Sequence, residues 1–180
     1  MKRVVNLFLF AVISCYAYAS GINKMYVQRN AGNECVFFIF SQKIPALDNT
    51  KMHTRNLEYD FTYAQRTDSV SMLLTVVLKE PVKMQKISIV NDNLSVSSAP
   101  ETIYVKSVGS KMKYRLRLMM SFEEFYQIYN SPNPYTLMLS TENQGKILEL
   151  MFGYDSKKWV DNSKKMRAII ELIKLNTGKK

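Results

Sequence analysis

The side chains that most often perform catalysis are scarce in this sequence. Its 180 residues include one histidine, His53, and two cysteines, Cys15 and Cys35. A Ser-His-Asp or Cys-His site would therefore have to use His53, which stands in a polar, basic stretch between Lys51 and Arg55. We interpret His53 as a surface-loop residue. The same counts exclude zinc sites that are built from several Cys and His ligands.

Two pairs of carboxylates could support acid–base chemistry, because two Asp or Glu side chains suffice for glycoside hydrolysis. Glu58 and Asp60 share one face of an expected strand, and Glu123 and Glu124 stand at the start of an expected helix. The first pair is also typical of the exposed side of a strand, and the second of a capped helix N-terminus. The glycines have no phosphate-loop spacing, and we expect no cofactor and no resident metal.

The elements that must position these residues are mostly strands. Apolar and polar residues alternate over 56–63 and again over 113–120, which predicts two strands with one buried face each, the second with a mostly basic outer face. Glycine, asparagine and polar residues at 30–33 and 65–69 predict hairpin turns. The run 36–40 is apolar on both faces and is expected to be a central strand, or one whose second face a helix covers. Further strands are expected at 24–28, 70–78, 86–90, 94–96, 102–106, 135–140 and 146–152.

Two helices are expected. Ser121 and Glu124 have capping-box spacing, and the prolines at 132 and 134 must end the short helix that follows. Over about 156–176, apolar residues recur at helical spacing after Trp159. The prediction is a mainly β (α+β) fold: an antiparallel sandwich or strongly curved sheet of about 7–9 strands, with one short helix and a C-terminal amphipathic helix packed on it.

Residues 1–19 have the features of a secretory signal peptide. Lys2 and Arg3 precede an apolar run of about 16 residues, which is shorter than a membrane-spanning helix, and small residues precede Ser20. Residues 12–15 also resemble a bacterial lipobox, in which Cys15 would carry lipid. We expect an exported protein, periplasmic or secreted, or alternatively an outer-surface lipoprotein. Residues 20–180 are expected to form a single β-rich domain, with Cys35 buried and lacking a disulfide partner in its own chain.

The chain is basic, with a net charge of +10, and loss of Lys2 and Arg3 with residues 1–19 would leave +8. The basic residues gather on the strand near residue 115, with Lys106 and Lys111 close by, and on the C-terminal helix. Solvation or protection of a strand edge would explain them, and so would an anion- or partner-binding surface. The residues that could form such a surface are Lys113, Arg115, Arg117, Lys157, Lys158, Lys164, Lys165 and Arg167.

These features favour an exported, non-enzymatic binding or interaction protein of the cell envelope or extracellular space. The expected partner is a protein or an anionic component of the envelope or membrane. Nucleic acid is disfavoured because no zinc-finger spacing and no RNP-like strand are present. One alternative is a binder of a small apolar ligand within the curved sheet, which the 11 Met and 11 Tyr residues suggest. The other is a carboxylate-dependent hydrolase.

Overall fold

The computed structural model describes residues 21–32, 34–48, 56–92, 94–141, 147–152 and 156–179. The expected signal peptide, Cys15 and His53 lie outside these ranges. The predicted fold class is confirmed: the described residues are mainly β, with one short helix and one C-terminal helix. Neither of these two helices has the length and apolar character needed to cross a bilayer.

Ten antiparallel strands are present in the described residues, compared with the seven to nine expected. They are β1 (Tyr26–Ala31), β2 (Glu34–Asp48), β3 (Asn56–Ala64), β4 (Ser69–Leu78), β5 (Met84–Asn91), β6 (Leu94–Ser98), β7 (Glu101–Val108), β8 (Lys111–Ser121), β9 (Thr136–Thr141) and β10 (Ile147–Phe152). Their order is β6-β5-β9-β10-β2-β3-β4-β8-β7. The long β2 has room along one edge for two partners, because β1 pairs with its first half and β10 with its end.

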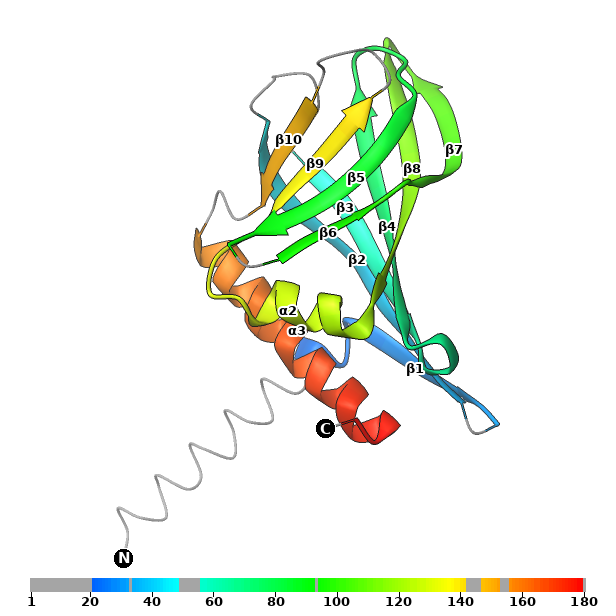
Figure 1. Cartoon of the computed structure of the whole chain (residues 1–180), viewed down its shortest axis with the longest axis vertical. Coiled ribbons are helices and arrows are strands. Elements are labelled where there is room, and N and C mark those ends of the chain that lie inside the picture. Colours follow the sequence, from blue (N-terminus) through cyan, green and yellow to red (C-terminus); the bar gives the residue numbers. More distant parts are fainter. Residues whose placement is uncertain are drawn as a thin grey trace, which may run out of the picture.

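The connections require this sheet to curl. β6 and β7 are the outermost strands of the order, yet only Ala99 and Pro100 separate them along the chain. Three Cα–Cα steps span at most about 11 Å, so the two edges must come close together. Figure 1 shows the strands wrapping around a common interior, with the helices at one end. Of the two predicted arrangements, a sandwich or a strongly curved sheet, the structure has the strongly curved sheet.

The alternation in the sequence correctly predicts which residues face this interior. On β3, Leu57, Tyr59, Phe61 and Tyr63 are all buried, and the intervening polar residues lie on the other face. The same holds on β8 for Tyr114, Leu116, Leu118 and Met120. The interior is therefore filled by large side chains, as expected for a small, barrel-like sheet.

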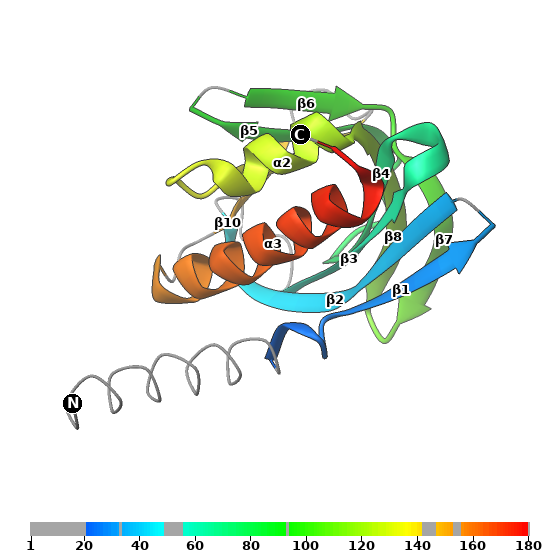
Figure 2. The same cartoon turned by 90° about the horizontal axis from the view of Figure 1, so that it is seen from below.

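The two helices close the lower end of the sheet as drawn in Figure 1, and we call this end the base. The capping box is present at the start of α2 (Phe122–Asn130): the Glu124 amide donates to Ser121 Oγ at 3.2 Å, and the Ser121 amide donates to Glu124 Oε2 at 2.7 Å. α3 (Ser156–Thr177) lies across the base beside α2 (Figure 2). Its apolar stripe is buried as predicted, and it comprises Trp159, Met166, Ile169, Ile170 and Ile173.

A group of aromatic side chains joins the sheet to the base. Tyr129 stacks on Trp159 with ring centroids 5.9 Å apart, and Tyr135 meets the same indole edge-on at 5.1 Å. The Asn162 amide donates to Tyr59 Oη at 3.4 Å. Burial raises the pKa of Tyr59 to about 12 and holds the pKa values of Tyr129 and Tyr135 well above their usual range.

The C-terminal end of the chain is tied to the turn between β3 and β4. Asp68 adopts a left-handed conformation in this turn, with φ 48°, and its carboxylate meets Lys179 Nζ at 2.5 Å. The Asp68 carbonyl accepts a hydrogen bond from the Phe122 amide at 3.2 Å, so the same residue also holds the start of α2. Asp68 thus links the turn between β3 and β4 to the start of α2 and to the segment that follows α3.

Candidate functional site

The outward side of the curved sheet carries more apolar surface than an open sheet face normally does. Antiparallel sheets with one packed face usually present polar residues on the other. Here Val27, Phe38 and Phe40 lie on the outward side and are 40%, 39% and 46% exposed. The described part of the chain has ten exposed large hydrophobic residues, and six of them lie on this side. They are the three just named together with Tyr104, Val108 and Met119.

Strand pairing explains why these three residues lie together. Val27 of β1 is directly opposite Phe38 of β2, and Phe40 follows two positions later on the same face. The register between β2 and β3 shifts between Ile39 and Gln42, as at a β-bulge, which bends a strand and re-aims its side chains. A shallow pocket of about 500 Å³ lies here, lined by Val27, Arg29, Phe38, Ile39, Phe40, Ser41, Asp60, Phe61 and Thr62.

A fixed ion pair borders the apolar residues. Arg115 of β8 reaches across β4 and pairs with the Asp60 carboxylate of β3, while its Nη1 donates to Thr75 Oγ1 at 2.7 Å. The side chains of Arg115 and Asp60 are only 17% and 22% exposed. Because both ends of the guanidinium are held, this charge is positioned before any partner arrives.

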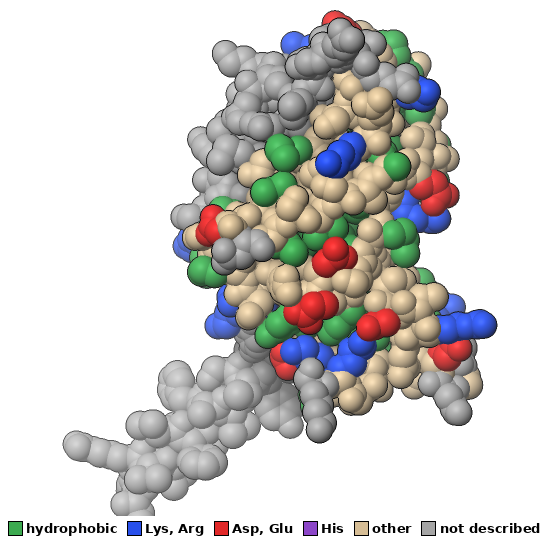
Figure 3. All heavy atoms as spheres, in the orientation of Figure 1, with side chains coloured by type: hydrophobic (Ala, Val, Ile, Leu, Met, Phe, Trp, Pro, Cys, Tyr) green, Lys and Arg blue, Asp and Glu red, His purple; other side chains and the backbone are tan. Residues whose placement is uncertain are grey.

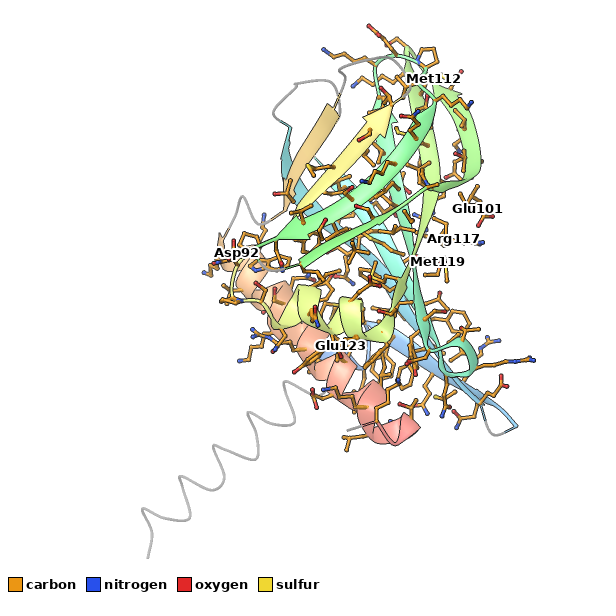
Figure 4. All side chains as sticks on the ribbon, viewed as in Figure 1. Asp92, Glu101, Met112, Arg117, Met119 and Glu123 are labelled. Atoms are coloured by element: carbon orange, nitrogen blue, oxygen red, sulfur yellow. The ribbon has the colours of Figure 1, made fainter. Side chains whose placement is uncertain are left out.

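A second ion pair extends the same surface toward β7. Arg117 Nη1 lies 2.7 Å from Glu101 Oε2, and Met119 stands two residues further along β8. Figure 4 shows Arg117, Glu101 and Met119 projecting from the same wall, away from the interior of the sheet. We call the set Val27, Phe38, Phe40, Asp60, Arg115, Arg117 and Met119 the outer face.

The basic residues singled out from the sequence occupy two separate regions. Lys113, Arg115 and Arg117 are on the wall, on the outward side of β8, whereas Lys157, Lys158, Lys164, Lys165 and Arg167 are on α3 at the base (Figures 1 and 2). Arg115 and Arg117 pair with acidic side chains, and Lys165 Nζ lies 2.6 Å from Asp161 Oδ2. On the side seen in Figure 3, Lys and Arg are scattered, with Asp and Glu between them.

Sequence reasoning did not identify the apolar part of the outer face. The signal was present in the run 36–40, which is apolar on both faces and was predicted to be central or covered by a helix. β2 is indeed central in the sheet. Both described helices, however, pack at the base and leave Phe38 and Phe40 exposed. The second apolar face of β2 therefore belongs to a surface.

The other candidate chemical groups are engaged in structural contacts. Asp60 is held by Arg115, and Glu58 Oε1 accepts a hydrogen bond from Ser41 Oγ at 3.0 Å. Glu124 forms the cap of α2, and Cys35 is 5% exposed, with its thiol pKa raised by burial. In the described ranges, no three His, Cys, Asp or Glu residues gather closely enough to hold a metal ion.

Comparisons with protein-family models, with curated proteins and with solved structures find no match to this chain.

Proposed function

We propose that this chain is an exported, non-enzymatic binding protein of the cell envelope or extracellular space, and that its outer face holds a partner protein. The observation that carries the proposal is the exposed group Val27, Phe38 and Phe40. It lies on the outward face of an antiparallel sheet, which is usually polar when the other face is packed. Contiguous apolar surface of this kind commonly marks an interaction site.

The composition of the outer face supports a protein partner. Aromatic residues, Met and Arg are enriched at the centres of protein–protein interfaces, and the outer face combines Phe38, Phe40 and Met119 with Arg115 and Arg117. The backbone is held in a sheet and the two guanidiniums are held by carboxylates. Binding of a partner would therefore cost little free energy for ordering this surface.

The charge pattern favours a protein over an anionic membrane or polymer. Asp60 lies within the outer face and pairs with Arg115, and Glu101 pairs with Arg117 at its border. Glu58 is on the same side of β3 as Asp60. Carboxylates in these positions would repel a uniformly anionic surface, whereas a protein can match a mixture of signs. The basic residues of α3 belong to the helix at the base and not to the strands that carry the outer face.

The two alternative functions receive less support from the geometry. A small apolar ligand inside the sheet would compete with large side chains such as Tyr59, Leu74 and Leu116, which are completely buried there. A hydrolase that used Glu58 and Asp60 would have to free Asp60 from Arg115. The outer face needs no such rearrangement to bind a partner.

Site-specific photo-cross-linking in cells that make the protein tests the proposal. A photoreactive amino acid is placed at Phe40 or Met119 on the outer face, and at Leu175, which is 78% exposed on α3, as the control. We expect a discrete protein adduct from the outer-face positions, lost when Phe38→Ser is added. Equal adducts from Leu175, adducts insensitive to Phe38→Ser, or adducts of lipid or polysaccharide alone would reject a protein-binding outer face.

A further inference from the structure

The edge strand β7 is unusual in being exposed along its whole length. All eight of its residues are exposed, including Ile103, Tyr104, Val105 and Val108 at 39–49%. Within the described residues it pairs only with β8, so one row of its backbone N–H and C=O groups has no strand partner. Exposed apolar edges of this kind are templates for pairing with another chain.

Two features limit where a strand could add to β7. The register with β8 shifts between Thr102 and Tyr104, so regular pairing is available only beyond this bulge. From there Tyr104, Lys106 and Val108 face outward beside Arg115, Lys113 and Lys111, while Val105 faces the inner side beside Tyr114. Lys106 is the charge at the middle of this edge, and its Nζ lies 5.6 Å from the Tyr104 ring centroid.

We propose that β7 pairs antiparallel with β7 of a second copy of this chain, about a two-fold axis at Val105. In this register Tyr104 of each copy is opposite Lys106 of the other, which places an ammonium beside an aromatic ring twice. An axis at Lys106 would instead place the two Lys106 ammoniums directly opposite each other. An axis at Tyr104 would place Lys106, which faces outward, opposite Thr102, which faces the interior. Among axes at Tyr104, Val105 and Lys106, charge and pleat together therefore favour Val105.

The inner side of the edge is suited to the same contact. Val105 borders a hollow of about 720 Å³ beneath the β4–β5 connection, whose other lining residues are Pro81, Val82, Lys83, Met84, Pro100, Thr102 and Tyr114. The two Val105 side chains meet at the axis, next to this mainly apolar surface. A two-fold arrangement also closes on itself, so pairing stops at a dimer and does not continue into a fibre.

Only residues 104–106 of each strand pair regularly in this register, because Ser107 and Val108 fall opposite Ile103 and Thr102 at the bulge of the other copy. The interface is therefore small and the dimer is weak, with a Kd in the micromolar range or above. Sedimentation velocity over micromolar to millimolar protein should show a concentration-dependent monomer–dimer equilibrium. Val105→Lys puts two ammoniums at the axis and should weaken the dimer about tenfold or more. Val160→Lys, at a 58% exposed valine on α3, is the matched control and should have no effect.

Cysteine scanning measures the register without disturbing the fold. Val105→Cys places two thiols opposite each other at the axis, within disulfide range, and should yield a cross-linked dimer on mild oxidation. Val160→Cys should not, and Cys35 is buried in every variant. A monomer at all concentrations, a dimer that survives Val105→Lys, or cross-linking that is strongest for Lys106→Cys would overturn the proposal. The outer-face cross-linking result is independent of all three outcomes.

Discussion

Three phenylalanines within four residues of β2 have different surroundings, and replacing each with alanine separates the core from the outer face. Phe37 is completely buried, with its ring centroid 5.6 Å from that of Tyr26 and 6.5 Å from that of Tyr63. Phe38 and Phe40 are 39% and 46% exposed on the opposite side of the same strand. Residue type and strand are therefore constant, and only the environment changes.

The expected losses of stability differ by at least about 2 kcal/mol. Phe37→Ala removes a fully buried ring and leaves a cavity, which costs about 3–5 kcal/mol. Phe38→Ala and Phe40→Ala remove partly exposed rings and leave no enclosed cavity, so each should cost about 1 kcal/mol. For a chain of this length Phe37→Ala should lower Tm by about 10 °C, and the other two by a few degrees.

Equilibrium unfolding in urea measures these differences, and Trp159 provides the signal because it is the single tryptophan and is 2% exposed. The same variants enter the cross-linking assay. Phe38→Ala should lose the partner adduct while keeping most of its stability. A cost for Phe38→Ala or Phe40→Ala as large as that for Phe37→Ala would refute the reasoning, because these rings would then serve the monomer's own packing.

Three further outcomes are expected. Asp68→Ala should lower the free energy of unfolding by about 1–2 kcal/mol, and Asp68→Gly should lower it by less. Both variants lose the ion pair with Lys179, but only alanine is strained at φ 48°. Equal losses for the two variants in urea unfolding would contradict this. Burial raises the pKa of Tyr59 from 10.0 to about 12, so its contribution to stability is complete below pH 10 and is lost as pH rises toward 12. Urea unfolding on both sides of pH 10, with ultraviolet titration of the phenolates, tests this, and unchanged stability through that window would contradict it. Mass spectrometry of the protein from its own cells should find Ser20 at the N-terminus, or a lipid-modified Cys15 for the lipoprotein alternative, whereas an intact Met1 would contradict export.

Much of the local structure follows from the sequence because it depends on backbone periodicity alone. Alternate side chains of a strand point to opposite faces, so the pattern over 56–63 suffices to predict which side chains of β3 are buried. The capping box of Ser121 and Glu124 depends on residues three apart, and the stripe of α3 on residues three and four apart. These elements were predicted correctly since each is determined within a few turns or pleats.

The arrangement of these elements depends on contacts between distant residues. Nothing near Ala99 and Pro100 specifies that they join the two opposite edges of the sheet, because strand order reflects the packing of the whole core. The pair between Arg115 and Asp60 requires β4 to lie between their strands, with both in register. Periodicity reveals that β2 has two apolar faces, but whether a helix covers the second is decided only when both helices pack at the base. That choice leaves Phe38 and Phe40 at the surface, where we propose that they contact a partner.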